Sequence, residues 1–261
     1  DVEVTARNDV TSELYLKSDS KFSYFYPAVN ASFVLTDAIE SLKNNDILSY
    51  FKLRGSWSKT ANADIGAYRL AATFSQGSGF PYGTLPGFSA DNSAVGVLTP
   101  EFINNKEAGF DLSFMRNRIN IEATYYHQNN TDQLLTINTS GATGYTGALV
   151  NAASFINKGL ELDLNLTPLV SFRDGNVKLR TNATYSESNI TEIYPGLDEL
   201  SIGGTGETRN NVINAAIVGS SAFLLKGTDY FRDDQGRVIV NQYTGAPTVD
   251  PTLKPFGQTM P

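Results

Sequence analysis

The strongest constraint on the fold is a strict alternation of apolar and polar residues between positions 153 and 188. Within 155–168, isoleucine or leucine fills positions 156, 160, 162, 164 and 166, and polar residues or glycine fill the odd positions from 157 to 167. Successive side chains of a β-strand point to opposite faces, whereas a helix would mix the two sets. The segment is therefore predicted to be a strand with one apolar and one hydrophilic face.

The same alternation resumes over 177–186 after a polar break at 171–176, so the two halves predict an antiparallel pair. Each arm has roughly 10 to 13 residues, which exceeds the usual strand of about 5 or 6. It approaches the length that a tilted strand needs to cross a bilayer. The strand length therefore favours a membrane β-barrel.

Hydropathy agrees with this interpretation. No run of 18 apolar residues occurs, which argues against a transmembrane helix, and residue 1 opens directly into strand-like sequence without a recognisable targeting segment. Only every second residue of a barrel strand faces lipid, so the low mean hydropathy of -0.22 remains compatible with a barrel.

The composition excludes several function classes. The chain of 261 residues contains no cysteine, which removes disulfides, thiolate metal sites and cysteine nucleophiles. A formal charge of -7 argues against a nucleic-acid partner, because a polyanion calls for a basic face. A length of 261 residues is ordinary for a single β-rich domain.

Seven strands are predicted in all, separated by connections that are alternately long and short. The strands cover 2–9, 24–36, 50–60, 105–115, 118–129, 155–168 and 177–188, and the long loops cover 61–104, 130–154 and 189–261. Residues 37–48 could form a turn of helix. An up-and-down membrane barrel sorts its connections in this way, with short periplasmic turns and long external loops. Tyr24, Phe25, Tyr26, Tyr125 and Tyr126 are expected at the outer interface, as an aromatic girdle.

Five segments resemble, in the correct order, the SusC/RagA class of TonB-dependent outer membrane transporters. Four of them are "YFYPAVNASFVLTD" (24–37), 51–62, "NKEAGFDLSFMRNRINIEATYY" (105–126) and "NAASFINKGLELDLN" (151–165), and the fifth is the tail, through its stretches 217–221 and 230–240. The resemblance covers essentially the whole chain and implies a plugged barrel of about 22 strands. Residues 1–261 would then be part of the barrel domain, an arc of about seven antiparallel strands, with the plug and TonB box absent.

The resemblance also implies a function and partners. Such transporters import glycan or peptide fragments, a SusD-like surface lipoprotein caps the barrel, and the TonB complex supplies energy through the N-terminal part that this chain lacks. The predicted location is the outer membrane of a Gram-negative, Bacteroidetes-type cell, with membrane lipid around the barrel. No catalytic residue, cofactor or metal is predicted.

Candidate site residues follow from the faces of the strands. The charged residues of the hydrophilic face are expected to line the lumen or to pack against the plug, and a role as a paired wall is favoured over direct substrate contact. They are Lys52, Arg54, Glu107, Asp111, Glu122, Glu161, Asp163, Lys178 and Arg180. Loop aromatics that could stack on a substrate are Phe80, Tyr82, Phe88 and Tyr145, although packing on one another is favoured.

Other candidate sites are weaker. His127 is the only histidine, which argues against a triad or a histidine metal cluster and favours an interfacial polar residue. Asp229, Asp233, Asp234 and Gly236 lack the spacing of a calcium loop, so a tight turn before a strand at 237–240 is predicted. A soluble β-sandwich or adhesin remains the alternative fold; it would turn the leucines at 160, 162, 164 and 166 inward against a second sheet.

Overall fold

The computed structural model describes residues 1–15, 22–43, 45, 47–67, 69–71, 74–76, 87–90, 93–94, 98–145, 147–204, 212–222 and 224–258. The chain divides into two compact units, Asp1–Glu187 and Ser188–Pro261. Each unit is described by itself.

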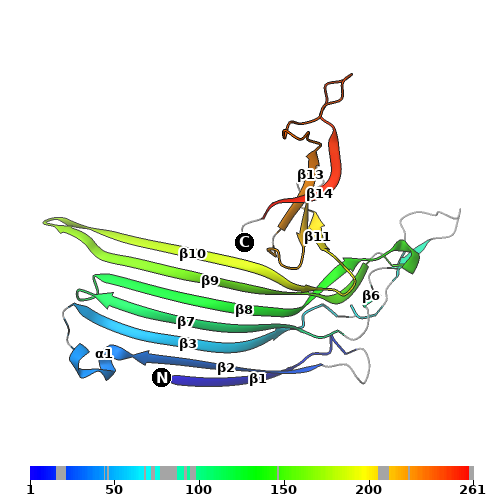
Figure 1. Cartoon of the computed structure of the whole chain (residues 1–261). Coiled ribbons are helices and arrows are strands. Elements are labelled where there is room, and N and C mark those ends of the chain that lie inside the picture. The colour runs from blue at the N-terminus through cyan, green and yellow to red at the C-terminus, as the bar shows by residue number, and fades with distance from the viewer. Residues whose placement is uncertain are drawn as a thin grey trace. The chain divides into compact units, whose positions relative to one another are not determined.

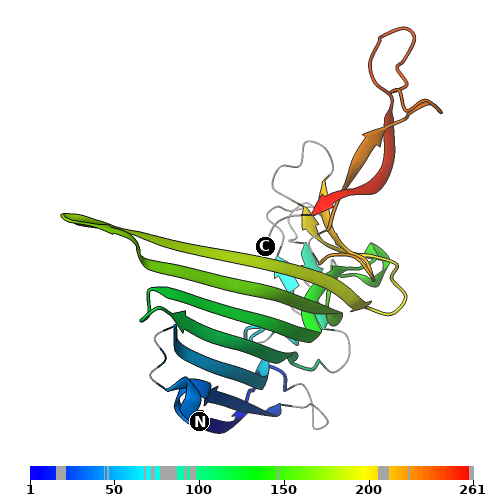
Figure 2. The same cartoon turned by 60° about the vertical axis from the view of Figure 1, so that its left-hand side comes forward.

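The first unit is built on one curved sheet whose strands lie side by side in the order β1-β2-β3-β7-β8-β9-β10 (Figures 1 and 2). The strands are β1 (Val2–Val10), β2 (Ser23–Val34), β3 (Leu48–Asn62), β7 (Glu101–Phe114), β8 (Ile119–Asn138), β9 (Gly147–Phe172) and β10 (Gly175–Ile193). Sequential neighbours pair antiparallel from β1 to β9, apart from the insertion between β3 and β7. The predicted arc of about seven strands is confirmed.

The longest strands exceed the prediction. β8 continues to Asn138 and β9 already begins at Gly147, so the predicted loop at 130–154 is wrong over most of its length. The pairing of β8 with β9 shifts register between Asn130 and Leu134, and Asp132 has a φ of 60°. Such a bulge inserts an extra residue and re-aims the side chains that follow, which hides the alternation.

The connections lie at two ends of the sheet. The tight turns at 115–118 and 173–174 lie at one end, together with the short helices α1 (Leu35–Ala38) and η1 (Glu40–Leu42). The described parts of the connections between β1 and β2, between β3 and β7 and between β8 and β9 lie at the other end, where η2 (Gly141–Thr143) is found. These are called the turn end and the loop end below. Met115, Arg116 and Asn117 all have positive φ, which the tight turn requires.

Part of the predicted loop at 61–104 also pairs. β4 (Phe74–Gln76) pairs with β5 (Phe88–Ala90), and β6 (Ser93–Ala94) runs parallel to the start of β9. Asn151 of β9 holds the return into β7, because its side chain donates to the carbonyls of Thr99 (2.8 Å) and Asp132 (2.7 Å) and accepts from the Thr99 N–H (3.0 Å).

A buried apolar cluster lies at the loop end and comprises Leu14, Tyr24, Leu98 and Leu149. Partly buried residues pack around it, including Phe102, whose ring meets that of Tyr24 edge to face with the centroids 6.3 Å apart. Close packing of this kind stabilises the strand extensions and the connections at the loop end.

The second unit contains its own sheet. Its strands are β11 (Leu200–Gly204), β12 (Ile213–Ala216), β13 (Leu224–Tyr230) and β14 (Val249–Gln258), in that order. The predicted loop at 189–261 is therefore wrong over much of its length. The sequence did not indicate these strands because they are short and shift register at Ser201, Leu225 and Gly227, so they show no long alternation. Its buried apolar residues are Ile190, Ile193, Leu200, Ala215 and Ala216.

Candidate functional site

The first sheet separates its side chains into two faces, and cross-strand register shows how each face is built. Residues directly opposite one another in an antiparallel pair point to the same side. On one face, Phe51, Leu112, Ile121 and Leu164 form a row, and Phe33, Leu53, Phe110, Ala123 and Leu162 form the next. Leu53, Leu160 and Leu162 are between 41% and 49% exposed, so no second layer of the first unit covers this apolar face in the described structure.

The opposite, polar face carries the charged residues that the sequence singles out. Its rows run across β3, β7, β8 and β9 through directly paired residues. The first row is Lys52, Asp111, Glu122 and Asp163; the second is Arg54, Gly109, Thr124 and Glu161; the third is Ser56, Glu107, Tyr126 and Gly159.

Asp111 is the centre of an ion-pair group on this face. Its Oδ1 lies 3.0 Å from Arg54 Nε and its Oδ2 lies 3.7 Å from Lys52 Nζ. Arg54 also donates from Nη2 to Thr124 Oγ1 at 2.7 Å. The Arg54 guanidinium therefore connects β3 with β7 and β8. Arginine suits this role better than lysine, because its planar group carries several N–H donors in a fixed arrangement.

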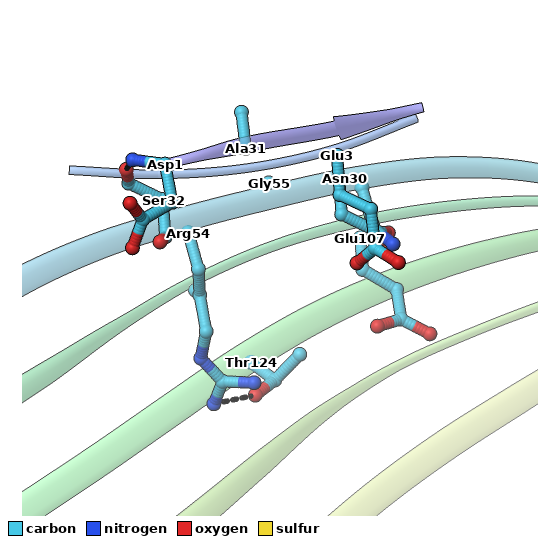
Figure 3. Close-up of a pocket in the computed structure, with 11 residues that line it drawn as sticks. Asp1, Glu3, Asn30, Ala31, Ser32, Arg54, Gly55, Glu107 and Thr124 are labelled. Carbon is cyan, nitrogen blue, oxygen red and sulfur yellow. Dashed lines mark hydrogen bonds between the residues drawn. The ribbon is translucent and has the colours of Figure 1, made fainter. Parts of the chain in front are cut away.

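A hollow of about 280 Å³ opens beside Arg54 (Figure 3). Asp1, Glu3, Arg54, Glu107 and Thr124 line it, and Figure 3 shows Arg54 and Glu107 on the same side of the sheet. A second hollow adjoins the first, since Arg54, Glu107 and Thr124 line both. Tyr126, Gln128, Asn157 and Glu161 complete it. Carboxylates therefore outnumber the one guanidinium in these two hollows.

The two remaining predicted residues, Lys178 and Arg180, lie on β10. Arg180 Nη2 is 3.5 Å from Asp163 Oδ2, which also accepts from Asn182 Nδ2 at 2.5 Å. Lys178 and Arg180 share one strand face, being two residues apart. The structure thus brings seven of the nine predicted residues into the three rows and the adjoining hollows, and places Lys178 and Arg180 on the neighbouring strand.

Sequence reasoning missed the uncharged members of this face. Thr124, Tyr126 and Asn182 hydrogen-bond to, or lie beside, the charged residues, although they carry no charge that would single them out. Gly159 gives space to Tyr126, since a Cβ there would lie 2.6 Å from the Tyr126 hydroxyl oxygen. The alternation itself, applied to polar residues without charge, would have found them.

The predicted loop aromatics are only partly described. Phe80 and Tyr82 lie outside the described residues, and of Phe88 only the pairing with Gln76 is described. Tyr145 is half-buried, and its backbone binds the hydroxyls of Thr139 and Thr143. These contacts order the backbone of the loop between β8 and β9.

The acidic segment at 229–236 of the second unit covers the end of β13 and the turn that follows it. Both oxygens of Asp233 are used locally, because Oδ1 accepts from the N–H groups of Gln235 and Arg237 and Oδ2 pairs with the Arg237 side chain at 2.8 Å. These bonds lower the pKa of Asp233, the N–H of Arg237 having the largest effect. The predicted strand at 237–240 is wrong, since Val238 and Val240 make only isolated bridges.

Among the described residues, no three acidic, histidine or cysteine side chains gather closely enough to hold a metal ion. No helix in the same part of the chain has the length and apolarity needed to cross a membrane.

Comparison with known proteins explains the two-faced sheet. Residues 1–256 match the family model described as TonB dependent receptor-like, beta-barrel. The chain belongs to this family of TonB-dependent receptors. The receptor is therefore an outer-membrane protein, and the fold is an arc of its β-barrel. In such a barrel the exposed apolar face is the lipid-facing side, and the tight turns are periplasmic.

Two relatives show how much of a receptor this chain spans. TonB-dependent receptor P26 of Formosa agariphila is 27% identical over 81% of the chain and 21% of its own length. TonB-dependent receptor SusC of Bacteroides thetaiotaomicron is 27% identical over 80% of the chain and 22% of its own length. The chain thus spans about a fifth of the length of these receptors.

A solved structure supports the same fold. The structure of the RagAB peptide transporter matches 96% of this chain and 27% of its own chain with a TM-score of 0.72. The sequence identity is 20%, so this likeness concerns the fold alone.

The barrel orientation refines the predicted aromatic girdle. Tyr125 lies on the lipid-facing side and is 48% exposed, in the row of Ala108 and Leu160. Tyr126 points to the other face, and Tyr24 is buried in the loop-end cluster. Tyr26, two residues from Tyr24 on the same face of β2, packs against that cluster. The girdle prediction is therefore wrong for Tyr24, Tyr26 and Tyr126, because adjacent strand residues cannot share a face.

Proposed function

We propose that this chain forms part of the wall of a TonB-dependent importer that carries glycan or peptide fragments across the outer membrane. The observation that carries the proposal is the pairing of an exposed apolar face with an opposite face of charged rows centred on Asp111. A wall of this kind separates lipid from an aqueous interior. The family membership of residues 1–256 supplies the transport context.

The charged rows would line the lumen. Lys52, Arg54, Asp111, Asp163 and Arg180 are paired strand to strand, which supports a structural wall for them. Glu107 and Glu161 instead border the two hollows beside Arg54. They are the wall residues that would meet a substrate or the plug.

The partners proposed for the whole receptor are a SusD-like surface lipoprotein at the loop end and the TonB complex at the periplasmic side. The likeness to SusC and the shared fold with the RagAB peptide transporter support this assignment. Glycan and peptide substrates are both retained, because the hollows offer hydrogen-bonding groups that suit either.

The test is uptake by cells that carry or lack the full-length receptor. Labelled oligosaccharides and labelled oligopeptides are supplied separately, with and without a protonophore that removes the energy source. We expect receptor-dependent, protonophore-sensitive uptake of one of the two classes. Surface binding of either label without energy-dependent uptake would overturn import as the function.

A variant pair connects uptake to the polar face. Glu107→Gln is expected to change the uptake rate, whereas Glu40→Gln, an exposed carboxylate at the turn end, is the matched control. Surface labelling of both variants checks that equal amounts reach the membrane.

The soluble β-sandwich alternative is not supported. It requires the leucines of β9 to be covered by a second sheet, whereas Leu160 and Leu162 are 49% and 41% exposed.

A further inference from the structure

A row of cationic and aromatic side chains crosses the lipid-facing side of the sheet at its loop end. Trp57 of β3 lies directly opposite Lys106 of β7, Lys106 lies opposite His127 of β8, and His127 lies opposite Lys158 of β9. Because directly paired residues share a face, the four side chains form one continuous line. We call these four residues the basic row.

The basic row marks the outer limit of the apolar band, at the loop end of the sheet. The next row toward the periplasm contains Ala108, Tyr125 and Leu160, and the last contains Phe114, Ile119 and Leu166. Phe114 is eight positions along β7 from Lys106, which corresponds to a height of about 20 Å along the membrane normal at a strand tilt of about 40°. The row therefore lies close to the outer edge of an apolar band that is about 25 Å tall.

The cations of the row are available to a ligand. Lys106 is exposed and has no ion-pair partner within the described structure. The Lys158 side chain is 45% exposed and lies 3.4 Å from Glu187, an exposed contact that contributes little. Trp57 is fixed beside them, because its Nε1 donates to Asn104 Oδ1 at 2.8 Å.

The charge distribution on the lipid-facing side is asymmetric. Lys59, one step further out, lies over the Phe102 ring with its Nζ 4.3 Å from the centroid and adds a third lysine to the loop-end region. The row at the turn end, Phe114, Ile119 and Leu166, contains no charge. Since the whole chain has a formal charge of -7, this local excess of cations is not a general property of the surface.

We propose that the basic row binds a phosphate group of an anionic lipid headgroup in the outer leaflet. Lys106 and Lys158 lie two strands apart, which is about 10 Å, so a headgroup with two phosphates would meet both lysines. Trp57 would pack against the adjoining glycolipid body or acyl region, as interfacial aromatics do. His127 contributes a hydrogen-bond donor between the lysines.

The binding test uses the full-length receptor in nanodiscs of neutral lipid. Lipid A is titrated, and retained lipid is counted by native mass spectrometry. The wild type should retain lipid A and bind enzymatically dephosphorylated lipid A far more weakly. Because lysines at a membrane surface attract anionic headgroups, K106Q/K158Q should weaken lipid A binding by about tenfold or more.

A matched control and a soluble probe complete the test. Lys43→Gln removes one exposed lysine at the turn end and should leave binding unchanged. Inorganic phosphate at millimolar concentration should not displace lipid A, because the proposed ligand is a membrane-embedded headgroup; displacement would assign the row to free phosphate and overturn the proposal. Equal retention of intact and dephosphorylated lipid A by the wild type overturns the proposal without relying on any variant, as does unchanged lipid A binding by K106Q/K158Q.

Discussion

Glu122 on β8 lies directly opposite Asp163 on β9, and its other neighbour in the same row is Asp111 on β7. Asp111 is paired with Arg54 and Lys52, and Asp163 with Arg180, whereas Glu122 is exposed and has no ion pair within the described structure. Like charges that face each other across strands are destabilising.

Replacing Glu122 should therefore stabilise the barrel. Glu122→Gln is expected to increase the free energy of unfolding by about 0.5 kcal/mol at low salt, and less at 1 M salt because screening weakens the repulsion. The measurement is the temperature at which the purified receptor loses its folded band on a gel. Glu40→Gln serves as a control, and a lower unfolding temperature for Glu122→Gln would mean that a cation from elsewhere in the receptor pairs with Glu122.

Removal of Arg54 should have the opposite effect. Arg54→Gln loses the bonds to Asp111 and Thr124, and we expect a destabilisation of about 1 to 2 kcal/mol. Arg54→Lys should recover only part of this loss, because an ammonium lacks the fork that reaches both partners. Arg7→Gln, which breaks the exposed pair with Asp9, is the control and should change stability very little. Thermal unfolding of the purified receptor measures all three, and an equal effect of both glutamine variants would contradict the prediction.

The lipid-facing assignment predicts a strong difference between two arginine substitutions. Leu162→Arg places a charge in the middle apolar rows and should destabilise the barrel by about 2 to 4 kcal/mol. Thr184→Arg, exposed on β10, shares a face with the polar Arg180 and Asn182 and should be tolerated. Chemical unfolding in lipid vesicles measures both values; tolerance of Leu162→Arg would show that Leu162 does not face hydrocarbon.

The second unit should be sensitive to acid. Asp250 accepts from Lys254 Nζ (2.6 Å) and from the Thr252 N–H (3.0 Å), and these bonds lower its pKa to about 2. A lowered pKa contributes stability that is present above the unfolded value, near 3.8, and is lost as the pH falls toward about 2. The pKa of Lys254 is raised by the same pair, so its contribution persists up to its ordinary value of 10.5 and is lost only above it.

Hydrogen exchange of the peptide 249–258 in the intact receptor would detect this loss. Protection, corrected for the intrinsic exchange rate, should fall between about pH 4 and pH 2 and remain constant at neutral pH. Asp250→Asn keeps an acceptor but no charge and should flatten the acid dependence. Unchanged acid sensitivity of the variant would assign the effect to other carboxylates such as Asp229, whose pKa is also lowered.

Alternation along the sequence is enough to predict the seven long strands of the first sheet and their two faces. It assigned Leu160 and Leu162 to the apolar face and Glu161 and Asp163 to the polar face, where the structure places them. Each assignment depends only on a period of two, which is a local property of extended backbone.

Alternation does not predict features that depend on strand register or on burial of both faces of a strand. The extension of β9 through Val150 and Ala152 is buried on both faces, so its residues do not alternate in polarity. The row of Lys52, Asp111, Glu122 and Asp163 joins residues from four strands, and only the pairing register brings them together. In the second unit, short strands with register shifts left no periodic signal.

The change from Tyr125 and Leu160 in one row to His127 and Lys158 in the next has a mechanical consequence. Moving the sheet by one row toward the periplasm would pull the lysine ammonium groups into hydrocarbon, and moving it by one row toward the cell exterior would expose leucines to water. Both displacements are opposed, so this one boundary sets the depth at which the arc sits in the membrane.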